Sequence, residues 1–125
     1  MTRLIVDRLK NRADFLRAAR GVRRSTASLT LELCPTPEAD PGRIRIGFTA
    51  SRKVGNAVSR NRAKRRLRAA AASVLPLHGR GGHDYVLVAR TETLSRRFAD
   101  LVEDLKGALK AVHARLDRSN RGEKT

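Results

Sequence analysis

Residues 55–68 read Gly55-Asn56-Ala57-Val58-Ser59-Arg60-Asn61-Arg62-Ala63-Lys64-Arg65-Arg66-Leu67-Arg68. After Gly55 the apolar residues recur at helical spacing and form one narrow stripe, made of Ala63, Leu67, Ala70 and Val74. At about 100° per residue, Arg60 and Arg66 flank this apolar stripe. The side opposite the stripe carries polar side chains, with Arg62 beside them: Asn61, Lys64, Arg65 and Arg68. The stretch predicts a helix with one packing face and one cationic face, which Pro76 and the glycines after it are expected to end.

Two segments before this helix alternate between apolar and polar residues, which is the period of a half-buried strand. They cover residues 28–33 and 43–51, and a loop rich in proline separates them. This arrangement predicts an antiparallel pair of strands. Further upstream, Phe15, Leu16 and Ala19 fall at helical spacing, which predicts a short helix from about Arg12 to Arg20.

The segments after the basic helix predict one more strand and one more helix. Residues 84–89 are apolar on both faces, as expected for a central strand. Thr93 or Ser95 is expected to begin a long helix with this core stripe: Phe98, Leu101, Val102, Leu105, Leu109, Val112 and Leu116. Residues 118–125 predict a disordered basic tail. The order α-β-β-α-β-α, which leaves room for a further short strand, predicts a single α+β domain over residues 1–117, built as a two-layer sandwich.

The positive charge of the chain is concentrated around the basic helix. The 125 residues carry a formal net charge of +16, and residues 43–83 contain eleven Lys or Arg but no Asp or Glu. Such a field repels itself in the folded protein and is relieved when the phosphates of an anionic polymer bind. The segregation of charge therefore predicts an extended nucleic-acid ligand.

Composition excludes several other classes of protein. Cys34 is the only cysteine, so the chain can form neither an intramolecular disulfide nor a zinc site of several cysteines. No apolar run reaches the ~18 residues of a membrane span, and charged residues interrupt the N-terminus before a signal peptide could form. We therefore expect a soluble cytoplasmic protein that binds no membrane.

Other interpretations of the basic helix are weaker. A merely solvated face does not account for bases four residues apart, such as Arg60 and Lys64, which repel each other by roughly 0.2–0.5 kcal/mol per pair. The apolar stripe is mostly alanine and too small for a membrane surface. A helix-turn-helix for DNA would need a second helix joined by a short turn, whereas a strand leads into this helix. The histidines are dispersed and the basic window has no carboxylate for metal ions, so no catalytic constellation is present.

Residues 53–65 carry a specific motif, Lys53-Val54-Gly55-Asn56-Ala57-Val58-Ser59-Arg60-Asn61-Arg62-Ala63-Lys64-Arg65. It closely resembles the Lys-(Val/Ile)-Gly-Asn-Ala-Val-x-Arg-Asn-Arg-x-Lys-Arg hallmark of the protein subunit of bacterial ribonuclease P. Residues 8–15 and 84–90 also resemble that family, and the similarity covers roughly residues 7–117. The resemblance implies a mixed sheet with a left-handed βαβ crossover through the basic helix, an exception to the right-handed rule.

The resemblance also implies an activity. The subunit would join a large catalytic RNA, and the holoenzyme would remove the 5′ leader of precursor tRNA by Mg²⁺-dependent hydrolysis. The protein alone is expected to bind no cofactor and to need no obligate protein partner. Two other functional classes stay open: a non-catalytic RNA-binding module such as a ribosomal protein, and a free-standing protein nuclease.

Individual residues take their expected roles from the resemblance. Contacts to the catalytic RNA are expected from the basic helix and the turn before it, namely Arg52, Lys53, Asn56, Arg60, Asn61, Arg62, Lys64, Arg65 and Arg68. Arg12 and Phe15 are expected to bind the single-stranded leader, with the Phe15 ring stacked on a base; the alternative is that Phe15 packs the first helix on the sheet. Where some family members carry further aromatic residues, this chain has Ala19 and, in its first predicted strand, Leu31 or Glu32.

Overall fold

The structure, a computed structural model, describes residues 3–36 and 40–123. Within them, strands and helices follow one another in this order: β1 (Ile5–Arg8), α1 (Arg12–Ala19), β2 (Val22–Ser25), β3 (Leu29–Pro35), β4 (Arg43–Ala50), α2 (Ala57–His78), β5 (His83–Ala89) and α3 (Phe98–Glu123). Single 3₁₀ turns, η1 (Arg52–Val54) and η2 (Thr91–Thr93), precede α2 and α3. The strands β1 and β2 were not predicted, because they have only four residues each and most of their side chains are exposed.

The strands form one mixed sheet in the order β1-β4-β5-β3-β2. β5 pairs parallel with β4 and antiparallel with β3. The predicted antiparallel pair of residues 28–33 with residues 43–51 is therefore wrong, since β5 lies between these strands. An alternating pattern identifies a strand but not its neighbour, and the apolar β5 takes the central place because helices cover both of its faces.

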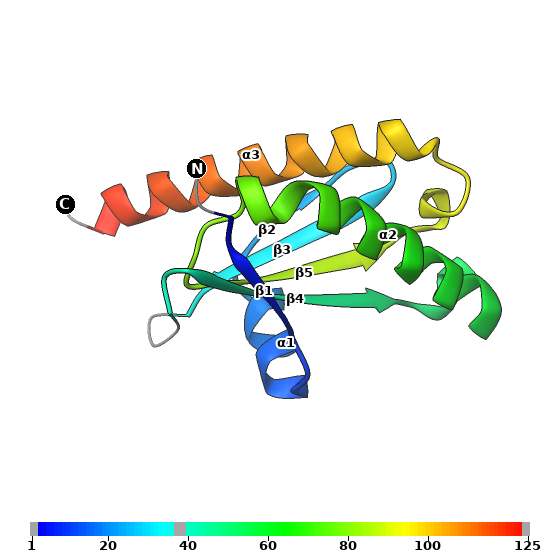
Figure 1. Cartoon of the computed structure of the whole chain (residues 1–125), viewed down its shortest axis with the longest axis horizontal. Helices are drawn as coiled ribbons and strands as arrows, with labels where there is room; N and C mark the ends of the chain where they lie inside the picture. Colours follow the sequence, from blue (N-terminus) through cyan, green and yellow to red (C-terminus); the bar gives the residue numbers. More distant parts are fainter. Residues whose placement is uncertain (1–2, 37–39, 124–125) are drawn as a thin grey trace.

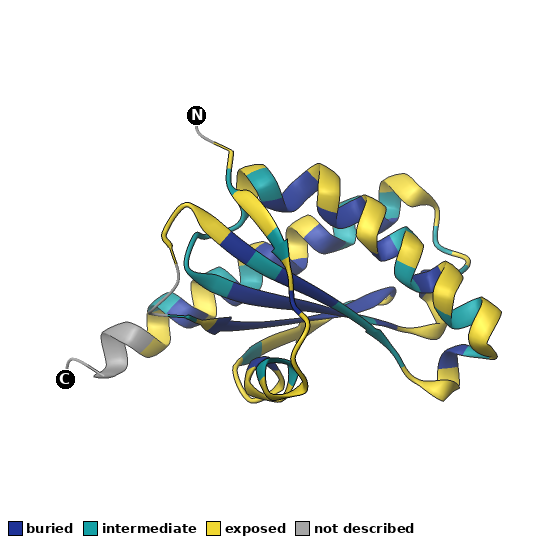
Figure 2. Ribbon diagram, turned by 60° about the horizontal axis from the view of Figure 1, so that its bottom comes forward, coloured by how far each residue is buried: buried dark blue, intermediate teal, exposed yellow. Residues whose placement is uncertain are grey.

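Helices lie on both sides of this sheet (Figures 1 and 2). α2 and α3 pack against each other on one face, and the main core between them and the sheet contains Leu31, Leu67, Tyr85 and Leu105. The short α1 lies on the other face, over a smaller cluster formed by Leu9, Ala18, Cys34 and Val86. The predicted α+β fold with a mixed sheet is confirmed, and α1 adds a partial layer on the second face of the expected sandwich.

The strand β3 is buried on both faces, not half-buried as its alternation predicted. Leu29, Leu31 and Leu33 belong to the main core, while the alternate residue Cys34 belongs to the cluster under α1. Glu32 is consequently 6% exposed. Burial raises the pKa of its carboxyl, and Arg23 on β2, at 3.8 Å, opposes that rise.

The connection β4–α2–β5 joins two neighbouring parallel strands through the basic helix. This is the unit in which the family resemblance implies a left-handed crossover, and the hand stays a prediction of that resemblance. Between the end of β4 at Ala50 and the start of α2 at Ala57, the chain turns back through η1, so the first turn of α2 lies beyond that end of the strand (Figure 1).

Three helix ends differ from the prediction. α2 continues through Pro76 to His78, since a proline in the last turn removes only one helical hydrogen bond. α3 begins at Phe98, because Thr93 instead caps η2 by accepting a hydrogen bond from the Arg90 backbone N–H at 2.9 Å. α3 runs as far as Glu123 and so enters residues 118–125, the predicted tail, of which residues 124–125 lie outside the described part of the chain. Across the described ranges 3–36 and 40–123, no helix has the length and apolar character that crossing a membrane requires.

Candidate RNA-binding surface

The turn between β4 and α2 fixes where the basic helix starts. Val54 is buried and anchors η1 on the core. Gly55 follows with φ of 142°, a region that side-chain-bearing residues rarely adopt, so glycine is required here. Asn56 then caps α2, because its side-chain oxygen accepts a hydrogen bond from the Ser59 backbone N–H at 2.9 Å.

The outer face of α2 and this turn carry most of the predicted RNA contacts. Asn61, Arg62, Arg65 and Arg68 are exposed on the helix, as are Arg52, Lys53 and Asn56 in the turn. Arg60 and Lys64 are partly buried. Among the side chains that the structure describes, in residues 3–36 and 40–119, no Asp or Glu forms an ion pair with any basic member of this set. The fold therefore gathers the predicted residues on one cationic surface, and we call these nine residues the α2 surface.

Two members of the α2 surface also stabilise the protein. The Asn56 side chain is the helix cap, and the Arg60 guanidinium donates to the carbonyl of Gly55 at 2.8 Å. Both contacts hold the turn before α2 in one conformation. Either residue can still present its remaining N–H donors to an anion, since each has more donors than the turn uses.

Arg66 is cationic but has a structural role. Its guanidinium donates to the carbonyls of Thr93 and Leu94, both at 2.8 Å, and to the carbonyl of Arg96. These bonds tie the segment before α3 to α2. The sequence placed Arg66 beside the apolar stripe and left it out of the predicted contacts, which agrees with this position.

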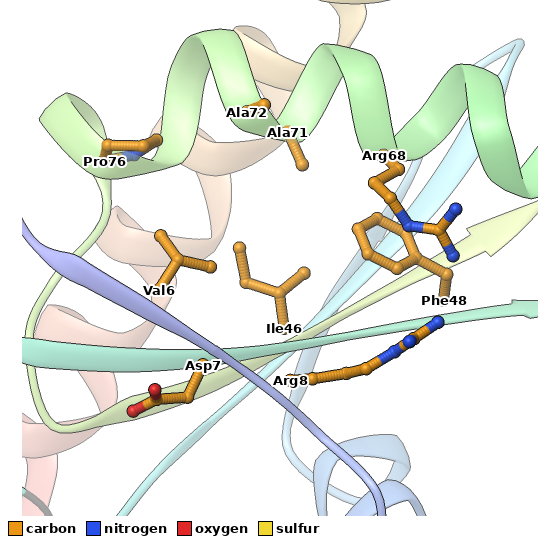
Figure 3. Close-up of a pocket in the computed structure, with 9 residues that line it drawn as sticks. All are labelled: Val6, Asp7, Arg8, Ile46, Phe48, Arg68, Ala71, Ala72 and Pro76. Carbon is orange, nitrogen blue, oxygen red and sulfur yellow. The ribbon is translucent and has the colours of Figure 1, made fainter.

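Arg68 stands over an aromatic ring. Its guanidinium carbon lies 5.3 Å from the centre of the Phe48 ring on β4, which is within the range of a cation–π contact. Next to this pair, β1, β4 and α2 enclose a mostly apolar hollow of about 440 Å³. Figure 3 shows Val6 and Ile46 on its strand side and Ala71 and Pro76 on its helix side. Sequence analysis did not predict this hollow, because the edge strand β1, which forms one of its walls, was not predicted either.

The predicted leader-binding residues lie on α1, on the opposite face of the sheet. Arg12 is exposed, and Phe15 is partly buried against the cluster of Leu9, Ala18, Cys34 and Val86. The Phe15 ring rests on the backbone of Gly47 in β4. Phe15 thus packs α1 on the sheet, as the alternative to leader binding proposed. It is only partly buried, so part of its ring stays accessible to a ligand.

A buried charge network fixes α1 on the sheet. Asp84 on β5 is 0% exposed and accepts two hydrogen bonds from Arg45, at 2.8 and 2.6 Å, and one from Arg17 on α1 at 3.0 Å. Asp14 on α1 accepts from the same two arginines. The hydrogen bonds to Asp84 raise the pKa of Arg45, so its guanidinium stays charged. Sequence analysis missed this network because its members are far apart in the chain.

The exposed arginines of the α2 surface can bind phosphates. In the part of the chain that the structure describes, no three His, Cys, Asp or Glu side chains gather where they could hold a metal ion. An extended row of cations beside Phe48 and Phe98 suits an RNA strand that has both phosphates and bases to offer.

Comparison with known proteins identifies the family. Residues 6–113 match the family described as Ribonuclease P. The chain belongs to the ribonuclease P protein family. It is 49% identical over 112 residues to the ribonuclease P protein component of Caulobacter vibrioides, covering 90% of this chain and 74% of the relative. It is 51% identical over 107 residues to that of Ruegeria pomeroyi, covering 85% and 86%.

A solved structure of the ribonuclease P family supports the same assignment. It is a mutant of the Staphylococcus aureus RNase P protein with defective mRNA degradation activity. The two chains superpose with a TM-score of 0.70 at 28% identity, over 83% of this chain and 86% of the other. The resemblance drawn from residues 53–65 is therefore confirmed by the rest of the chain.

Proposed function

We propose that this chain is the protein component of a ribonuclease P ribonucleoprotein and that it supports 5′ maturation of tRNA. The observation that carries the proposal is the α2 surface, a set of cations gathered on one rigid element without acidic partners among the described residues. Its relatives are ribonuclease P protein components, which supports this role over that of a ribosomal protein.

The α2 surface binds the RNA subunit in this proposal. Arginine forks hold phosphates through two hydrogen bonds, and the exposed Arg62, Arg65 and Arg68 lie along one side of a single helix. The stiff helix sets the spacing of these contacts before the RNA arrives. Arg52, Lys53 and Asn56 extend the surface around the turn at its N-terminus.

The leader of precursor tRNA binds at α1 in this proposal. Arg12 offers a charge to the leader backbone, and the accessible part of the Phe15 ring offers a surface for a base. The network around Asp84 holds α1 in a fixed position on the sheet, which preorganises the contact.

Hydrolysis belongs to the RNA subunit in this proposal. The RNA subunit would hold the Mg²⁺ ions that the reaction requires; the described residues of this chain bring no three His, Cys, Asp or Glu side chains together for a metal ion. The protein contributes binding and orientation of the substrate, which act by lowering the entropic cost of reaching the reactive geometry.

Reconstitution tests the proposal. The purified chain is combined with the ribonuclease P RNA of the same organism and 5′-labelled precursor tRNA, beside RNA alone and protein alone. We expect saturable binding of the RNA, faster leader removal with both subunits than with RNA alone, and no cleavage by the protein alone. Failure to bind this RNA, or leader removal by RNA-free protein, would contradict it.

The variant Phe15→Ala tests whether the leader of precursor tRNA binds at Phe15. We expect it to weaken binding of precursor tRNA to the holoenzyme by ~1–3 kcal/mol and to leave binding of mature tRNA nearly unchanged, because only the precursor has leader bases. Urea unfolding of the same variant measures its packing role. Equal losses for both tRNAs would show that Phe15 only packs α1.

A further inference from the structure

Phe98, the first residue of α3, is an aromatic side chain that the fold leaves accessible. The helical period placed it in the core stripe of α3, yet it is 44% exposed. The chain has only three phenylalanines, one tyrosine and no tryptophan. Because the sequence has so few aromatic residues, an accessible Phe98 ring indicates a surface that contacts a ligand.

The surroundings of Phe98 are cationic. Together with Arg62, Arg65, Arg66 and Ala69 of α2, it lines an open hollow of about 360 Å³. Arg62 and Arg65 are exposed, and neither forms an ion pair within the described residues. Ala69 is small, so the helix leaves room beside the ring. The hollow thus joins one aromatic surface to two available guanidinium groups.

The position of Phe98 is fixed by the contacts of its neighbours. Arg66 binds three carbonyls in the segment just before α3, and Arg96 in that segment is held by Asp104 at 2.9 Å. Hydrogen bonds from Arg96 and Ser28 outweigh the effect of burial and lower the pKa of Asp104, so this clamp stays charged at neutral pH. The backbone that carries the Phe98 ring is therefore held in place before a ligand arrives.

We propose that Phe98, Arg62 and Arg65 form a stacking site for one unpaired nucleobase of the RNA subunit. The base lies on the exposed face of the Phe98 ring, and the two arginines bind the phosphates on either side of that nucleotide. A base within a duplex cannot reach the ring, so the site selects a bulged or single-stranded nucleotide. A protein segment fits this hollow less well, since Ala69 is its only other apolar residue. The inference rests on the proposed function, because it assigns a specific contact to the same RNA.

A fluorescent variant tests the stacking directly. The natural chain has no tryptophan, so Phe98→Trp introduces a single reporter ring at the proposed site. We expect its emission to be quenched when the ribonuclease P RNA of the same organism is added, as a base stacks on the indole. Leu77→Trp, at an exposed position near the other end of α2, is the matched control and should change little. RNA that binds with equal emission changes in both variants would overturn the inference.

Affinity measurements separate stacking from packing. Phe98→Ala and Phe98→Leu should both weaken binding of this RNA by about 5-fold or more, because neither offers an aromatic face, whereas Phe98→Trp should restore it. If Phe98 only packs the start of α3, Phe98→Leu should bind RNA as tightly as the natural chain, and the inference is then wrong. If the natural chain does not bind this RNA at all, the proposed function fails as well. Thermal unfolding of each variant confirms that the compared proteins are folded.

Discussion

The ring of Phe15 on α1 lies so close to Gly47 on β4 that a Cβ atom added there would be 2.4 Å from Phe15 Cε1. No real Cβ contact is that short, so α1 docks in this position only because residue 47 lacks a side chain. The Phe15 ring occupies the space that a side chain at residue 47 would fill, so this packing requires glycine at position 47.

Gly47→Ala should displace Phe15 and loosen α1 from the sheet. We expect a loss of about 1–3 kcal/mol in the free energy of unfolding, as for other overpacked interiors, measured by urea denaturation. Gly107→Ala is the control: it lies within α3, and a Cβ there meets nothing within 4 Å. That change should stabilise the protein by up to about 1 kcal/mol. Equal behaviour of the two variants would contradict the packing described for Phe15.

Arg65→Ala and Arg66→Ala should change different properties although the residues are adjacent: the first should weaken RNA binding, and the second should lower the stability of the protein. Arg65 is exposed without an acidic partner in the described structure, so its loss should leave stability unchanged. The slope of log affinity against log salt for the RNA should fall in magnitude by about 0.7–1. Arg66→Ala leaves three carbonyls without their donor and should cost roughly 1–3 kcal/mol of stability. An unchanged salt slope in Arg65→Ala would remove Arg65 from the RNA contacts.

Asp84→Asn should destabilise the protein more than a comparable surface change. Asp84 is fully buried and binds Arg45 and Arg17, so its neutralisation leaves these two guanidinium groups with Asp14 as their one remaining shared anion among the described residues. We expect a loss of about 3–5 kcal/mol, measured by chemical denaturation. Asp7→Asn, which breaks a more exposed pair with Arg43, should cost less than about 1 kcal/mol. Similar losses in both variants would show that the charge network around Asp84 does not stabilise the packing of α1 on the sheet.

His113 should make stability depend on pH. The Tyr85 hydroxyl lies 2.8 Å from His113 Nε2 and also accepts the Arg80 backbone N–H, and burial raises the pKa of Tyr85 to about 12. The phenol therefore donates to a neutral imidazole. Burial first, then the charges of Arg80 and His83, lower the pKa of His113 to about 4, while Asp117 opposes them.

The unfolded chain, with an ordinary histidine pKa near 6.5, therefore binds a proton that the folded protein does not take up until about pH 4. Stability should fall by at most about 3 kcal/mol as pH drops from 6.5 towards 4. His113→Gln, which can still accept from Tyr85, should flatten the unfolding free energy between pH 5 and 6.5, a window above the titration of most carboxylates. The exposed His78→Gln serves as control. A variant with an unaltered pH profile would exclude His113 as the cause.

The basic helix could be predicted because its information is local. The period of Ala63, Leu67, Ala70 and Val74 identifies its buried side, and all four are buried in the structure. Strand pairing could not be predicted in the same way, because β5, which pairs with β3 in the centre of the sheet, lies some fifty residues further along the chain. The helical period also fails at the end of an element: it assigns Phe98 to the core side of α3, but Phe98 is 44% exposed and lines a hollow with Ala69 and arginines of α2.

The roles of the charged residues divide in the same way. The helical projection separated Arg65 from Arg66, and their different partners agree with it. It could not indicate that Asn56 caps the helix or that Asp84 collects two arginines, since both depend on distances that only the folded chain sets. The motif assigned Asn56 to the RNA contacts, and the structure shows that its side chain also caps α2.

The central position of β5 also decides when this protein can fold during its synthesis. Of the strands described, β5 is the last to leave the ribosome, yet β4 and β3 meet only through it. A nascent chain that ends before His83 can form the β1–β4 pair and the β2–β3 hairpin, but each of these has an open edge that could pair with another chain. The two half-sheets cannot join before β5 has been synthesised, and α3, which covers them, follows β5 in the chain. Most of the sequence must therefore be translated before any part of the domain acquires its final stability.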